Sequence, residues 1–130
     1  MTAFKILKYS IITILVLFTF FIIKSFYEQK RDINEIKKYP AFTDGIIIEY
    51  THSGISGRYY QYDYYVNNIK YVNDAGTDNP LDCENIGYSN CEGEKYKVIY
   101  SKKNPQNSYL LTERYSYELF NLKVPQELLR

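Results

Sequence analysis

A run of fifteen uncharged residues near the N-terminus, YSIITILVLFTFFII, constrains the fold of this chain more than any other feature. The run extends from Tyr9 to Ile23 and contains neither proline nor glycine. No polar face interrupts it, which argues against a buried core helix. Fifteen helical residues cover only about 22 Å, whereas the hydrocarbon core of a membrane is ~30 Å thick. The run therefore needs the residues that flank it in order to span a membrane.

Aromatic and basic flanks lengthen the run. Phe26 and Tyr27 continue its apolar character, and the side chains of Lys8 and Lys24 can extend to the two membrane interfaces. The stretch Tyr9–Tyr27 contains nineteen residues, which is long enough to span. We therefore predict that it forms a single-pass transmembrane helix in contact with membrane lipid.

A cleaved signal peptide is the alternative interpretation, because Lys5 and Lys8 precede the apolar run. Cleavage requires small residues at the end of the apolar segment, whereas this chain reads FFIIKSFYEQK there. No cysteine follows the run closely, so a lipoprotein-type attachment site is missing as well. We predict an uncleaved anchor with a short N-terminal tail at residues 1–8.

The charges around the anchor give conflicting indications of its orientation. Two lysines precede the anchor, and five Lys or Arg residues lie within residues 24–40, a count that favours a cytoplasmic location for the rest of the chain. The short tail resembles that of a signal-anchor, however, and three acidic residues dilute the downstream bases. We predict that the rest of the chain lies outside the cytoplasm.

Residues 28–40 connect the anchor to the remainder of the chain. Their composition is compatible with a helix up to Pro40, which disfavours helical geometry at the preceding Tyr39. We predict a juxtamembrane helical stalk that continues the anchor helix in solvent. A partner-binding helix is the alternative.

Beyond the stalk the hydrophobic period changes to two, and six of the sixteen tyrosines crowd into GRYYQYDYYVNNIKYVND, residues 57–74. Asn67 and Asn68 favour a two-residue hairpin turn, because asparagine tolerates positive φ. That turn pairs Val66 with Ile69, Tyr65 with Lys70, Tyr64 with Tyr71 and Asp63 with Val72. Alternation then places one apolar set on a single, half-buried face: Tyr60, Tyr62, Tyr64, Val66, Ile69 and Tyr71.

Two tyrosines of this hairpin fall on its other, mixed face. Tyr59 and Tyr65 are left over after the inward tyrosines have been assigned to a core. Large aromatic side chains on an exposed face are the type of residue that protein interfaces use. Tyr59 and Tyr65 are therefore the candidates for contact with a protein partner, and a role as ordinary exposed strand residues is the alternative.

Further segments complete a mainly β domain at residues 41–130. Strands are predicted at Gly45–Ser53, Glu94–Ser101 and Ser108–Glu113, and Ile99 falls on the outward face of the second of these. With the hairpin this makes about five strands, typical of a small antiparallel β-barrel or rolled sheet. The tail at residues 114–130 is compatible with an edge strand or with a short helix over an open end.

Cys83 and Cys91 are the only cysteines of the chain. The loop between them is short enough for a disulfide, which would suit an oxidising compartment. Free thiols and a metal site are the alternatives, although two thiols and one histidine fall short of the four ligands that zinc prefers. We predict the disulfide, which would also indicate on which side of the membrane this part of the chain lies.

Other chemistry has little support in the sequence. Residues 41–130 contain nine bases and twelve acids, so a nucleic-acid partner is not expected. The acidic residues between Asp74 and Glu94 match no calcium-loop spacing, and we predict no metal, cofactor or small-molecule substrate. His52 is the sole histidine and lies at a strand end, where a structural role is favoured over catalysis. The chain is thus expected not to be an enzyme.

Four segments of the chain together match a known pattern: the anchor, GIIIEY, YYQYDYYVNNIKYV and CENIGYSNCEGEKYKVIYSKKNPQNSYLL. In this respect the chain resembles small uncharacterised membrane-anchored proteins of Bacteroidetes-type bacteria. It is also similar to a broader family of domains of unknown function, with membrane helices and a small β-domain. The matching strand and turn are marked by Tyr100, Asn104 and Pro105. The resemblance implies a fold and a location but no mechanism.

These observations support three functional hypotheses. The first is a non-enzymatic interaction module that holds or regulates a protein partner at the cell envelope. The second is an immunity-type or stress-related envelope protein that neutralises a toxin. The third is a cryptic hydrolase that uses His52, and it has the least support.

Overall fold

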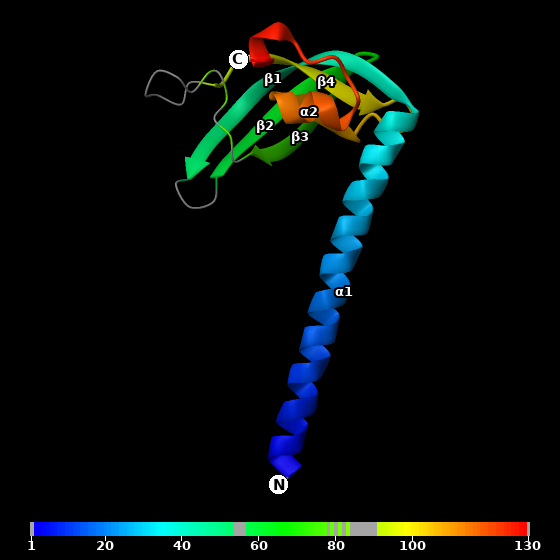
Figure 1. Cartoon of the computed structure of the whole chain (residues 1–130), viewed down its shortest axis with the longest axis vertical. Coiled ribbons are helices and arrows are strands. Elements are labelled where there is room, and N and C mark those ends of the chain that lie inside the picture. Colours follow the sequence, from blue (N-terminus) through cyan, green and yellow to red (C-terminus); the bar gives the residue numbers. More distant parts are fainter. Residues whose placement is uncertain are drawn as a thin grey trace. The chain divides into compact units, whose positions relative to one another are not determined.

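The computed structural model describes residues 2–53, 57–77, 79, 81, 83 and 91–129. The chain forms two compact units, Met1–Asn34 and Glu35–Arg130. The first is helical, and the second contains a β-sheet and two short helices. Figure 1 shows these elements along the chain.

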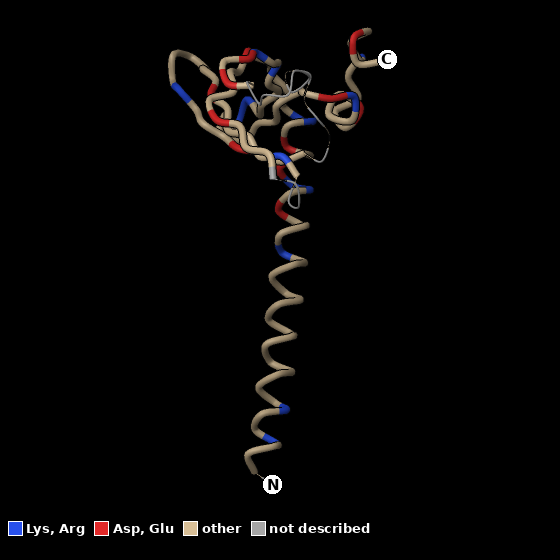
Figure 2. Tube along the Cα trace, turned by 90° about the vertical axis from the view of Figure 1, so that its left-hand side faces the viewer, with Lys and Arg blue, Asp and Glu red and all other residues tan. Residues whose placement is uncertain are grey.

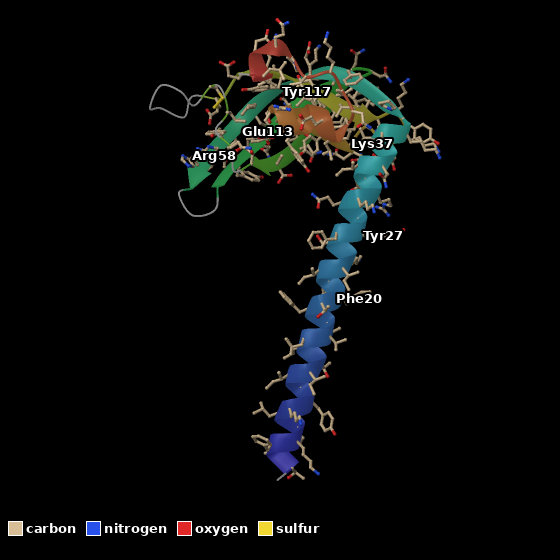
Figure 3. All side chains as sticks on the ribbon, in the orientation of Figure 1. Phe20, Tyr27, Lys37, Arg58, Glu113 and Tyr117 are labelled. Atoms are coloured by element: carbon tan, nitrogen blue, oxygen red, sulfur yellow. A yellow bond between two sulfur atoms is a disulfide. The ribbon has the colours of Figure 1, made fainter. Side chains whose placement is uncertain are left out.

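Helix α1 (Thr2–Lys38) is long and apolar enough to cross a membrane. Its apolar side chains are exposed, and Figure 3 shows Phe20 and Tyr27 projecting from the ribbon. Figure 2 shows a long stretch of this helix without acidic or basic residues. The two threonine hydroxyls within that stretch are satisfied internally, because Thr13 and Thr19 donate hydrogen bonds to the carbonyls of Tyr9 and Leu15. Such internal pairing is what a lipid environment demands.

The last turn of α1 belongs to the second unit. The helix continues without interruption past Tyr27 and ends at Lys38, two residues before Pro40. Ile36 in this turn is buried, and the Tyr39 N–H donates to the Glu35 carbonyl at 3.0 Å. The stalk region thus ends in a turn that is packed into the second unit.

Five antiparallel strands form one curled sheet in the order β3-β2-β1-β4-β5 (Figure 1). The predicted fold, an N-terminal apolar helix followed by a small rolled sheet of about five strands, is confirmed. The strands are β1 (Pro40–Ser53), β2 (Gly57–Val66), β3 (Ile69–Thr77), β4 (Lys95–Ser101) and β5 (Ser108–Leu111).

Strand β1 is the centre of this sheet and is longer than the sequence predicted. It begins at Pro40 instead of Gly45, because residues 40–46 pair with β4. Residues 45–53 pair with β2, and the register shifts between Ile47 and Glu49, which marks a β-bulge at Ile48. One strand thus joins both halves of the sheet.

The hairpin between β2 and β3 has the predicted turn and register. Asn67 and Asn68 have φ values of 50° and 64°, as a type I′ turn requires. The strands pair Val66 with Ile69, Tyr65 with Lys70, Tyr64 with Tyr71 and Asp63 with Val72, which confirms the predicted partners. One detail of the prediction is wrong: Ile69 is 57% exposed, because it lies at the hairpin end beyond the core.

The buried face of this hairpin carries a stack of tyrosine rings. Centroids of Tyr62 and Tyr64 are 5.8 Å apart, and those of Tyr64 and Tyr71 are 5.6 Å apart. Tyr60 joins the row at 6.3 Å from Tyr62. Offset aromatic pairs at such distances contribute roughly 0.5–1.5 kcal/mol beyond the area they bury. These rings, with Ile47, Val98 and Leu110, form the main core.

Polar side chains join the two edge strands of the curled sheet. The Asn73 amide of β3 donates to the Gln106 carbonyl at 3.1 Å and to the Ser108 hydroxyl of β5 at 3.0 Å. The Gln106 amide donates to the Val72 carbonyl at 2.9 Å. Two tyrosine hydroxyls of the core also reach this place. The Tyr62 hydroxyl forms a hydrogen bond with Ser108 Oγ at 2.9 Å, and the Tyr64 hydroxyl donates one to the Pro105 carbonyl. We call these contacts the polar seam.

A second, smaller core covers the opposite face of β4 and β5. Ile99 and Leu111 are buried on that face, and the Phe120 ring packs edge-on against Tyr109 at 5.4 Å. The tail forms helix α2 (Arg114–Leu119) and a short 3-10 helix, η2 (Gln126–Leu129), as the helical alternative predicted. Ile99 therefore points outward from the main core, but the tail covers it.

The sheet is closely packed around Gly45, where β1 pairs with both neighbours. A Cβ there would lie 2.5 Å from Val98 Cγ2 and 3.3 Å from Leu110 Cδ1. We expect Gly45→Ala to lower the free energy of unfolding by roughly 1–3 kcal/mol through overpacking. Urea unfolding of the full chain in detergent micelles measures this change.

Two comparisons make the Gly45 prediction specific. Thr51→Ala, at an exposed position of the same strand, should cost less than about 1 kcal/mol. In a Val98→Ala background, which provides room, Gly45→Ala should cost less than it does alone. Equal costs in both backgrounds would show that steric crowding is not the reason.

Burial of the tyrosine core predicts a loss of stability in alkali. Burial raises the pKa of Tyr60 from 10.0 to about 12, because the phenolate is disfavoured away from water. The resulting stabilisation is fully present below pH 10 and is lost as the pH rises towards 12. Each pKa unit of difference between the folded and unfolded states corresponds to about 1.4 kcal/mol. We therefore expect ionisation of Tyr60 to account for about 2–3 kcal/mol of this loss.

Urea unfolding at several pH values between 9 and 12 measures this dependence. The Tyr60→Phe variant serves as the control, since it lacks the ionisable group at that position. We expect the variant to lose less stability than the parent protein across this range. Identical pH profiles would contradict the role assigned to Tyr60.

Candidate partner-binding face

The outer face of the sheet is the surface of β1, β2 and β3 that lies opposite the tyrosine core. On β2 the side chains alternate, so that Tyr60, Tyr62 and Tyr64 are buried whereas Tyr59 and Tyr65 are exposed. The α2 tail covers the neighbouring part of this side over β4 and β5. The outer face bears six exposed large hydrophobic residues: Phe42, Ile46, Ile48, Tyr59, Tyr65 and Val72.

Both tyrosines that the sequence nominated lie on this face. Tyr65 is 56% exposed and Tyr59 is 43% exposed. They are six positions apart along the strand, which corresponds to roughly 20 Å, so they mark opposite ends of the face. The structure therefore does not bring them together as one cluster.

Tyr59 is oriented by an acidic neighbour on β3. Its hydroxyl donates a hydrogen bond to Asp74 Oδ2 at 3.0 Å. This hydrogen bond and the nearby negative charge raise the pKa of Tyr59, since both favour the neutral phenol. Tyr65 is held through its backbone, where its carbonyl accepts a hydrogen bond from Thr43 Oγ1 at 3.2 Å.

The aliphatic residues between the two tyrosines were not nominated from the sequence. Ile46 is opposite Asp63 of β2, and Ile48 lies at the bulge, where exposed Ile48 and Glu49 follow each other. The GIIIEY run contains the signal, because three consecutive isoleucines cannot all face one side of a strand. The bulge itself depends on pairing with β2 and has no local sequence signature.

Two ion pairs lie on this face. Lys70 Nζ lies 2.9 Å from Asp63 Oδ2, and the hydrogen bond between them raises the pKa of Lys70. Lys97 Nζ donates to Asp44 Oδ1 at 2.6 Å, which lowers the pKa of that carboxyl. Exposed pairs of this kind add little stability. They do neutralise four charges beside the exposed hydrophobic residues, which suits a protein partner.

The structure joins Cys83 and Cys91 in a disulfide, and Cys91 is buried. Strand β1 holds the chain that follows: the Gly93 N–H donates to the Ile47 carbonyl at 2.7 Å, and the Ile47 N–H donates to the Glu94 carbonyl at 3.0 Å. The disulfide thus lies next to the strand that carries the bulge.

The remaining candidates for chemistry do not assemble into a site. His52 is exposed on β1, opposite Arg58. Within the described residues, no three His, Cys, Asp or Glu side chains are grouped to hold a metal ion. Asp78, Asp82 and Glu84 of the acidic segment lie outside the described part of the chain.

Comparisons with protein-family models, with curated proteins and with solved structures find no match to this chain. The resemblance to small membrane-anchored proteins therefore stays a prediction.

Proposed function

We propose that this protein is a single-pass membrane protein whose β-domain acts as a non-enzymatic docking module for another protein of the cell envelope. The outer face carries this proposal, because it combines exposed aromatic and aliphatic side chains with paired charges. The apolar helix α1 would confine the module to the membrane. Confinement raises the effective concentration of a partner in the same membrane.

We place the β-domain on the extracytoplasmic side of the membrane. The Cys83–Cys91 disulfide supports this orientation, because disulfides persist in oxidising compartments and are rare in the cytosol. The five basic residues within residues 24–40 argue for the opposite orientation by the positive-inside rule. The disulfide has the greater weight, since it depends directly on the compartment.

Thiol labelling in intact cells tests the orientation and the disulfide. An impermeant maleimide should label the protein only after treatment with an impermeant reductant. The Cys83→Ser/Cys91→Ser double variant should stay unlabelled, because it has no other cysteine. In that background Tyr115→Cys, at a 60% exposed position, should react without reduction. Labelling of Tyr115→Cys only after lysis would place the domain in the cytoplasm.

Site-specific photo-crosslinking tests the docking face. A photoreactive phenylalanine in place of Tyr65 should give a discrete protein adduct in intact cells. The same group in place of Tyr115, which is similarly exposed but lies on α2, should give none. Tyr59→Ala should weaken adduct formation at position 65, by about tenfold if Tyr59 is an interface hot spot. Identical adduct patterns from positions 65 and 115, or no adduct from position 65, would contradict the proposal.

A further inference from the structure

Two lysine side chains lie at the Tyr39 ring where helix α1 ends, and each has a lysine neighbour in sequence; we call Tyr39 and these four lysines the Tyr39 cluster. Lys37 and Lys38 end the helix, and Figure 3 shows Lys37 there. Lys102 and Lys103 come from the turn after β4, beside Tyr39, because the Lys102 N–H donates to the Tyr39 carbonyl at 2.8 Å. The cluster therefore combines two segments that are far apart in the sequence.

Two ammonium groups lie at one phenol ring. Lys103 Nζ is 4.6 Å and Lys38 Nζ is 5.5 Å from the Tyr39 ring centroid, within the range of cation–π contacts. The positive surroundings, chiefly the Lys103 hydrogen bond to the phenol oxygen, lower the pKa of Tyr39. Three hydrogen-bond donors, the two ammonium groups and the phenol hydroxyl, are thus gathered at one place on the surface.

The turn that presents Lys103 is fixed by a buried hydroxyl. Ser101 is fully buried and pairs with Pro40 of β1. Its Oγ accepts hydrogen bonds from the N–H groups of Lys103 at 3.2 Å and Asn104 at 3.3 Å. The position of the Lys103 backbone is therefore set by the fold.

The positive charge of the cluster is not balanced by the protein. None of the four lysines forms an ion pair with a carboxylate of the described residues, whereas Lys70 and Lys97 each do. Glu35 is the nearest acid along the helix, but its Oε1 is buried and has no hydrogen-bond partner in the described part of the chain. Like charges held at one ring repel each other, and a bound anion would relieve that repulsion.

We infer that the Tyr39 cluster binds the phosphate of an anionic phospholipid headgroup. Lys37 follows Tyr27, the end of the predicted membrane span, by ten residues, which is about 15 Å of helix. The bilayer surface is thus the phosphate source that the chain itself keeps nearby. Basic segments close to a membrane helix are attracted to anionic lipid in this way. The inference depends on the proposed membrane anchoring but not on the outer face.

NMR spectroscopy of the full chain in zwitterionic detergent micelles tests the inference. We expect short-chain phosphatidylglycerol to shift the amide signals of Tyr39, Lys102 and Lys103 in a saturable, salt-sensitive manner. Short-chain phosphatidylcholine should not shift them. Lys38→Gln/Lys103→Gln should weaken the binding by roughly thirtyfold, or about fivefold for each lysine. The control Lys95→Gln/Lys123→Gln removes the same charge at other exposed positions. It should change the affinity for phosphatidylglycerol by less than about twofold.

Each alternative outcome is informative. Equal weakening in the two double variants would overturn the site in favour of general charge attraction. Shifts of the same amides by inorganic phosphate at the same concentrations would overturn the lipid as the occupant in favour of a free anion. Equal shifts with phosphatidylcholine would overturn recognition of negative charge. The labelling and crosslinking experiments do not involve these lysines, so either proposal can fail while the other stands.

Discussion

The double pairing of strand β1 is the constraint on which the rest of the β-domain depends. Its first half pairs with β4 and its second half with β2, and Gly45 belongs to both ladders. Because Gly45 has no side chain, Val98 and Leu110 can approach the β1 backbone. The same strand follows directly in sequence on the last turn of α1, so the first strand after the helix is the central one. An edge strand could not pair with both β2 and β4, because an edge strand has a neighbour on one side only.

The tyrosine rings supply much of the hydrophobic interior of this small domain. A unit of fewer than about 100 residues buries limited area, and each phenol ring contributes much of it. The hydroxyl groups require partners, because a buried unpaired hydroxyl is costly. Tyr62 and Tyr64 solve this by extending across the core to the polar seam, where Ser108 and the Pro105 carbonyl receive them. Core and seam are therefore parts of one arrangement.

Local patterns determine how much of this structure can be predicted from the sequence. The long apolar helix and the β2–β3 hairpin have local signatures, namely an uncharged run and an Asn-Asn turn between alternating residues, and both could be predicted. The early start of β1 and the bulge at Ile48 arise from pairing with distant strands, so alternation alone misses them. Ile99 is buried beside its cross-strand partner Tyr109, on which Phe120 of the tail packs, and alternation does not reveal this arrangement. For the candidate site, Tyr59 and Tyr65 follow from alternation, whereas the Tyr39 cluster requires the tertiary position of the β4–β5 turn.

The seam between β3 and β5 has a consequence for encounters between copies of the protein. An open sheet edge exposes backbone groups that can pair with the edge of another molecule, and such pairing leads to aggregation. The Gln106 amide already occupies the Val72 carbonyl on the β3 edge, and Asn73 fastens that edge to the opposite side of the sheet. Another copy of the protein that meets this edge therefore finds the Val72 carbonyl already bonded and the strand fastened within its own sheet.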